Sequence, residues 1–168
     1  MIRNLVIVSS LTGNTRQIGQ ALVKAYPDTQ LMSTQEAKDN ALLDVVENVA
    51  VGFWCGHGGM PEDVKALMPQ LINKRLGVFA TMGGDPQSEN AKAWLGEQAA
   101  ALVGEDRANT LVATFMCRGK IAQPIIEQMK KMPGWATPER LARWQSAATH
   151  PDQADEAAAV AAFAGLFD

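Results

Sequence analysis

At 168 residues, with 47% hydrophobic and 20% charged residues, the chain has the size and composition of one globular domain with a sizeable core. A formal net charge of −3 and the lack of any apolar stretch near the roughly 20 residues of a membrane span argue against nucleic-acid and membrane partners. The two cysteines, Cys55 and Cys117, form no CxxC pair, which argues against a disulfide framework or a zinc site. We therefore expect a cytoplasmic protein.

Five short segments are predicted to be β-strands. Four are continuous apolar runs, which is typical of parallel strands covered on both faces. The fifth, "TQLMS", is weaker and is expected at a sheet edge. In chain order the predicted strands are residues 5–8, 29–33, 49–54, 76–81 and 111–116.

Apolar residues at helical spacing lie between and after these strands. The stripes are Ile18, Ala21, Leu22 and Ala25; Val64, Leu67, Met68 and Leu71; Leu95, Ala99 and Leu102; and Ile125, Met129 and Met132. A short helix from Thr137 and a terminal helix with Val160, Phe163, Ala164 and Phe167 follow. The alternation of strands and helices predicts a three-layer α/β fold with right-handed crossovers. We expect one domain over residues 1–168, with extra C-terminal helices over about 137–168.

The sequence "SLTGNT", residues 10–15, joins the first predicted strand to the first predicted helix. Its place beyond the carboxyl end of a strand is where parallel sheets bind ligands, and a helix N-terminus favours an anion. Gly13 lets the chain curve around a tetrahedral group. The side-chain donors of this loop are Ser10, Thr12, Asn14 and Thr15. Because the loop lacks both the lysine of GxxxxGK[ST] and a GxGxxG pattern, we interpret it as a phosphate site made of amides and hydroxyls. A plain cluster of helix caps is the alternative.

This loop resembles the phosphate loop Ser/Thr-x-Thr-Gly-Asn-Thr of the flavodoxin family. The chain length and the order of the loops are similar to that family along most of the sequence. The resemblance implies a flavodoxin-like doubly wound sheet of five parallel strands in the order 2-1-3-4-5, a noncovalent FMN and one-electron transfer. By position, the residues around the FMN phosphate would be Ser10, Leu11, Thr12, Gly13, Asn14 and Thr15.

Two more loops are similar to those that enclose the isoalloxazine ring of FMN in flavodoxins. On one face the resemblance places Trp54, Cys55, Gly56, His57, Gly58 and Gly59. On the other face it places Thr81, Met82, Gly83, Gly84 and Asp85. Reduction of the flavin adds a proton at N5, and a glycine carbonyl can turn to accept its hydrogen bond. Gly56, Gly58 and Gly59 are all candidates for that carbonyl. Trp54 either stacks on the ring or fills the core.

Two features depart from the flavodoxin pattern. Electron-carrying flavodoxins usually have an aromatic residue, often Tyr, after the fourth strand, where this chain has Asp85 and Pro86. One face of the ring is therefore open, or covered by Met82 or by a partner. The loops also carry Arg118 and Lys120, so acidic steering of a basic partner is modest. These two cations either contact the ligand or a partner, or belong to a solvated turn.

These features favour an FMN-binding electron carrier that exchanges electrons with a redox partner protein, either a reductase or an acceptor. An FMN-dependent NAD(P)H or quinone reductase is one alternative, and a flavodoxin-like subunit with weak or no FMN binding is another. The sequence has no Ser/His/Asp set and no metal-ligand spacing, so we expect neither a hydrolase nor a metal site.

Overall fold

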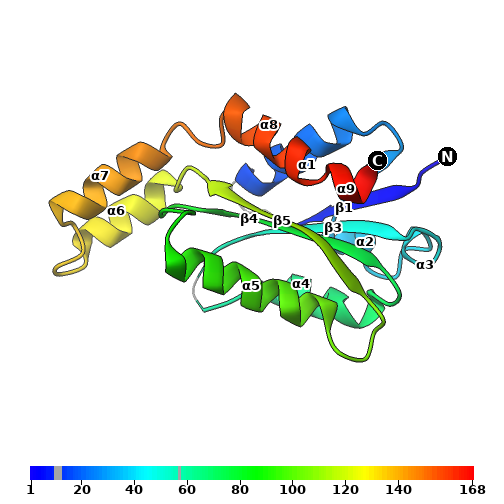
Figure 1. Ribbon diagram of the computed structural model, residues 1–168. Helices are drawn as coiled ribbons and strands as arrows, with labels where there is room; N and C mark the ends of the chain where they lie inside the picture. Colours follow the sequence, from blue (N-terminus) through cyan, green and yellow to red (C-terminus); the bar gives the residue numbers. More distant parts are fainter. Residues whose placement is uncertain (10–12, 57) are drawn as a thin grey trace.

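The computed structural model describes residues 1–9, 13–56 and 58–168. A five-stranded sheet forms the middle layer of the fold (Figure 1). Its strands are β1 (Asn4–Val8), β2 (Thr29–Ser33), β3 (Asn48–Trp54), β4 (Arg75–Met82) and β5 (Thr110–Arg118). They pair in parallel in the order β2-β1-β3-β4-β5. The predicted flavodoxin-like fold class and strand order are confirmed, including the weak strand at an edge.

The register of the sheet brings the ends of three strands level with one another. Trp54 at the end of β3 lies opposite Thr81 of β4, and Thr81 lies opposite Cys117 of β5. All strands point the same way, so the loops that follow them emerge at one edge. Residues far apart in the sequence are thereby placed at a common site.

Helices cover both faces of the sheet (Figure 1). One face carries α1 (Asn14–Ala25), α8 (Gln153–Ala162) and α9 (Ala164–Phe167). The other carries α2 (Thr34–Ala37), α3 (Leu42–Val45), α4 (Glu62–Leu67), the 3₁₀ turn η1 (Met68–Gln70) and α5 (Glu89–Val103). The predicted single terminal helix is two helices that meet at Phe163, whose buried ring packs edge-to-face on Phe79 at 5.8 Å. None of the helices in the described part of the chain is long and apolar enough to cross a membrane.

Two helices cover neither face and extend past the carboxyl ends of the strands (Figure 1). These are α6 (Gln123–Lys131) and α7 (Pro138–Ala147), which together form the α6–α7 hairpin. The predicted stripe of Ile125 and Met129 is present on α6, but no residue of α6 is buried. Trp144 and Ala147 are the buried residues of α7. The periodicity correctly predicted that α6 is a helix. The apolar face of α6 does not pack on the sheet, unlike the apolar faces of α1, α4 and α5.

A substitution at Gly52 tests the packing between the sheet and the layer formed by α1, α8 and α9. A Cβ at Gly52 in β3 would overlap the ring of Phe79 on the neighbouring strand, and both residues lie in the core. We expect Gly52→Ala to lower the free energy of unfolding by about 1–3 kcal/mol, the usual cost of overpacking. Chemical denaturation of the two proteins measures this difference in the free energy of unfolding.

Gly96 in α5 is the matched control, since it is exposed and a Cβ there would meet no heavy atom of the described residues within 4 Å. Gly96→Ala should raise stability by about 0.5–1 kcal/mol, because glycine is a poor residue for a helix interior. Equal effects of the two substitutions would contradict this account of the core.

Candidate functional site

The N-terminus of α1 is fixed by side chains that do not cap the helix. Gly13, the N-cap residue, has φ of +88° and no side chain with which to cap. Asn14 donates from Nδ2 to the carbonyl of Lys120 at 2.7 Å. Thr15 is only 1% exposed, and its hydroxyl forms a hydrogen bond of 3.0 Å with the hydroxyl of Thr81. These contacts argue against a plain cap cluster and connect the first loop to the loops after β4 and β5.

The same end of α1 is suited to an anion. Its first turn contains no acidic residue, and the dipole of a 12-residue helix places partial positive charge there. A Cβ on Gly13 would meet no heavy atom of the described residues within 4 Å. Gly119 packs closely on Asn14, because a Cβ at Gly119 would lie 2.8 Å from Asn14 Nδ2. The predicted phosphate residues Ser10, Leu11 and Thr12 lie outside the described residues.

A cavity of about 250 Å³, which we call the ring slot, opens at the carboxyl ends of β3 and β4. Its walls come from three parts of the chain. The predicted ring residues that line it are Trp54, Cys55, Gly56, Gly83 and Gly84. The remaining lining residues are Ile121, Ile125, Met129, Arg143 and Trp144, from the α6–α7 hairpin and the segment before it. The structure therefore unites both predicted ring loops and adds a third wall.

Two glycines give the ring slot its shape. A Cβ at Gly56 would lie 2.8 Å from the Trp54 ring, and one at Gly83 would lie 2.5 Å from Ile121 Cδ1. Each glycine thus allows a large side chain to lie directly on the backbone. The loop after β3 is also tied to β4, because the backbone N–H of Cys55 donates to the carbonyl of Thr81 at 2.8 Å. A main-chain hydrogen bond therefore helps to hold this wall of the slot.

The other predicted ring residues that the structure describes are not among those that line the slot. Gly58 has φ of +84°, a conformation that glycine adopts at little cost, while a side chain at Gly56 would be excluded by Trp54. Gly59 and Met82 do not line the slot. Asp85 lies 3.9 Å from the guanidinium of Arg118. The prediction for His57 lies outside the described residues.

Sequence reasoning missed the third wall. The Ile125–Met129 stripe was visible as a helix, but nothing local indicated that it faces Trp54 and the Gly83 loop. Nothing in the sequence around Trp144 indicated that this helical tryptophan would line the slot. Arg118 connects the wall to the body: Nη1 donates to Ser146 Oγ on α7 at 3.0 Å. The sequence left the ring face near the loop after β4 open, or covered by Met82 or by a partner, and did not consider the hairpin residues that line the slot.

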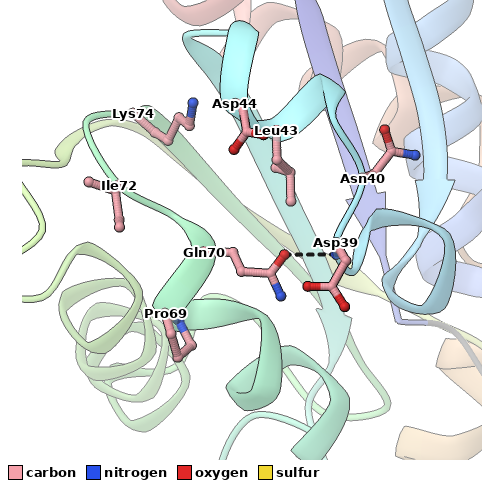
Figure 2. A pocket seen from close by; sticks show the side chains of 8 residues that line it. All are labelled: Asp39, Asn40, Leu43, Asp44, Pro69, Gln70, Ile72 and Lys74. Carbon is pink, nitrogen blue, oxygen red and sulfur yellow. Dashed lines mark hydrogen bonds between the residues drawn. The ribbon is translucent and has the colours of Figure 1, made fainter.

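A larger polar cavity of about 600 Å³ lies at the opposite edge of the sheet, before β3 and β4 (Figure 2). Its polar groups mainly bind protein atoms. Gln70 accepts from the backbone N–H of Asp39 at 2.8 Å, and the buried Lys74 donates to the carbonyl of Val46 at 2.7 Å. Burial lowers the pKa of Lys74, against the opposing effect of Asp44. Lys74 here satisfies the carbonyl at the end of α3, which is a structural role.

One cluster outside the slot has metal-ligand chemistry. It consists of His150, Asp152 and Asp155, whose ligand atoms lie within 4.8 Å of one another. His150 Nδ1 lies 2.6 Å from Asp155 Oδ2, and Asp152 and Asp155 accept each other's backbone N–H at 2.9 Å. These bonds form the capping box at the start of α8. The cluster is accounted for by capping that helix.

The two thiols are unpaired and poorly suited to nucleophilic chemistry. Burial, with smaller contributions from the carboxylates of Asp155 and Asp152, raises the pKa of Cys117 to about 12. Burial also raises the pKa of Cys55. Both thiols therefore stay protonated near neutral pH, as expected for small apolar residues.

Cys117 predicts a loss of stability in alkali. Above its unfolded-state pKa of 9.0 an unfolded thiol ionises, whereas the folded one stays protonated until about pH 12. The contribution is complete below pH 9.0 and declines up to about pH 12. Between about pH 9 and pH 10.5, unfolding free energies of the natural chain should fall faster than those of Cys117→Ala, by up to about 1.4 kcal/mol per pH unit. Parallel curves for the two proteins would contradict the burial of this thiol.

Comparisons with known proteins agree with this geometry. The flavodoxin-like domain-containing protein BilS of Clostridioides difficile is 27% identical over 164 residues, covering 90% of this chain and 89% of BilS. General stress protein 14 of Treponema denticola, whose structure contains FMN, matches with a TM-score of 0.56 at 9% identity, covering 95% of this chain and 98% of that one. An archaeal flavodoxin matches with a TM-score of 0.53 at 18% identity, covering 86% of this chain and 97% of that one.

The two solved structures show a shared fold, and membership rests on the family as a whole. The flavodoxin domain family matches residues 5–164, which include the ring slot and, apart from Asn4 of β1, the five strands of the sheet. The chain belongs to the flavodoxin domain family, and FMN is the cofactor that this membership supports.

Proposed function

We propose that this protein binds FMN and transfers electrons to or from a redox partner protein in the cytoplasm. The observation that carries the proposal is the contact between the two halves of the site. Thr15, in the first turn of α1, bonds Thr81, which lies beside Trp54 in the sheet register. An anion site and a ring slot are therefore adjacent, as a flavin mononucleotide requires.

The phosphate end of FMN would be held without a cation. Gly13, Asn14 and Thr15 supply the helix N-terminus, together with the predicted residues 10–12. The anchoring of Asn14 on Lys120 and of Thr15 on Thr81 fixes the direction of the N–H groups. Preorganised dipoles of this kind bind an anion without reorganising.

The ring of FMN would lie between Trp54 and the opposing walls of the slot. Met129 and Trp144 supply the apolar and aromatic surface that the loop after β4 lacks. Bound FMN supplies the one-electron chemistry, while these residues orient it and exclude water. Among the three candidate glycines, Gly58 already has a positive φ, and its carbonyl would be our candidate to accept a hydrogen bond from the flavin N5–H.

The reductase alternative has less support. It requires room over the ring for a second planar substrate. The α6–α7 hairpin, through Ile125, Met129, Arg143 and Trp144, lines one side of the ring slot and so limits that room. Stopped-flow mixing of the FMN-loaded protein with NADPH separates the two functions. Rapid bleaching of the flavin would establish the reductase in place of the carrier.

The phosphate site is tested at Gly13 with two variants that differ only in charge. Asn and Asp tolerate a positive φ better than other non-glycine residues, and a Cβ at Gly13 would meet no heavy atom of the described residues within 4 Å. Gly13→Asp places a carboxylate beside the phosphate, so we expect it to bind FMN at least tenfold more weakly than Gly13→Asn. Riboflavin, which lacks the phosphate, should bind the two variants equally. Quenching of flavin fluorescence on titration measures all four affinities. If Gly13→Asp weakens the binding of FMN and of riboflavin equally, relative to Gly13→Asn, the phosphate lies elsewhere.

The third wall is tested with two tryptophans of the same hairpin. Trp144 lines the slot, whereas Trp135 stacks under Arg140 at 4.5 Å near the hairpin turn and does not line it. Trp144→Ala should weaken the binding of both FMN and riboflavin about tenfold, since base-sized aromatic stacking is worth about 1–3 kcal/mol. Trp135→Ala should change either affinity less than twofold. Thermal melts of the flavin-free variants identify any general loss of structure.

A further inference from the structure

We propose that the α6–α7 hairpin is the docking surface for the redox partner, and that the partner presents an acidic surface with an apolar centre. This inference rests on the proposed function, because it names the partner of the same site. It reverses the usual arrangement in which an acidic flavin edge steers a basic partner.

The charge of the hairpin is opposite to that of the rest of the chain. Residues 123–147 contain four Lys or Arg and two Glu, while the remaining residues contain eleven Lys or Arg and sixteen Asp or Glu. Lys130 and Lys131 are exposed at the end of α6, and Arg143 is exposed on α7. A basic projection on an acidic body orients the molecule in the field of an acidic partner.

Exposed apolar side chains lie among these cations. Met132 and Leu141, neither of which lines the ring slot, are 42% and 37% exposed, and α6 buries no residue against the body. Next to them, Arg140 lies over the ring of Trp135. Apolar side chains together with Trp, Arg and Met are the composition of protein interfaces, whereas a solvated helix face has few of them.

The hairpin also separates this surface from the flavin by a single layer. Ile125 and Met129 line the ring slot, so a partner bound on the outer side of α6 would be about one helix diameter, roughly 10 Å, from the ring. Electron transfer weakens steeply with distance, and this surface offers a short path. Arg118 holds α7 through Ser146, and Trp144 is buried, so the surface is ordered before it binds.

The test uses two redox proteins of opposite charge as probes: an acidic plant-type ferredoxin and basic cytochrome c. Isothermal titration of the flavin-free and FMN-loaded protein at low ionic strength should show ferredoxin binding and little binding of cytochrome c. Raising the ionic strength to about 0.15 M should weaken ferredoxin binding, because the Debye length falls to about 8 Å. Tighter binding of cytochrome c, or no binding of ferredoxin, would overturn the proposal.

A pair of double variants separates the hairpin from net charge. Lys130→Glu/Lys131→Glu should weaken ferredoxin binding at least tenfold. Lys24→Glu/Lys92→Glu makes the same change of net charge on exposed residues of α1 and α5 and should weaken it less than threefold. Equal losses would show that only net charge matters, and so would overturn the docking surface.

Two further outcomes are distinguishable. If the protein takes up no FMN but the flavin-free form binds ferredoxin through the hairpin, the proposed function fails and the docking surface stands. If the hairpin variants lose binding to vesicles containing phosphatidylserine while ferredoxin binds neither form, the basic apolar surface contacts a membrane and the protein-partner proposal is overturned.

Discussion

The buried hydrogen bond between Thr15 and Thr81 is the contact on which the site depends. It joins the first turn of α1 to the end of β4 at 3.0 Å, across 66 positions of sequence. The parallel sheet brings these two hydroxyls together, because the start of α1 and the end of β4 lie at the same edge of the sheet. The anion site on one side and the ring slot on the other share this junction, so displacement of either threonine would separate the two halves of a flavin site.

The slot beside this junction is built from small residues and large ones in alternation. Gly56 lets Trp54 lie on its backbone, and Gly83 does the same for Ile121. The α6–α7 hairpin then supplies the wall that a flavodoxin usually takes from an aromatic residue after the fourth strand. Because no residue of α6 is buried, its apolar residues do not form part of the core and are available to line the slot and its rim.

Charge is distributed in a way that fits both parts of the proposed function. The end of α1 contains no acidic residue in its first turn, and dipoles suffice for an anion there. Lys130 and Lys131 lie instead at the exposed end of α6 and do not line the slot, so they are available to a partner, while Arg143 of α7 lines the slot. The polar cavity at the other edge, in contrast, is occupied with hydrogen bonds that hold α3 and the start of β4 in place (Figure 2).

The sequence by itself determined the elements of this protein and its fold class. Continuous apolar runs identified four of the five strands, because burial on both faces leaves a local pattern, and the weaker segment TQLMS was expected at the edge. The "SLTGNT" loop and the two glycine-rich loops indicated a flavin nucleotide and where its parts would lie. Tertiary structure decided which helix faces which loop: Asn14 meets Lys120 across 106 positions, and the Ile125–Met129 stripe meets the Trp54 loop instead of the sheet. Helical periodicity records that a face is apolar but not what covers it, since that depends on how distant segments are placed by the register of the sheet.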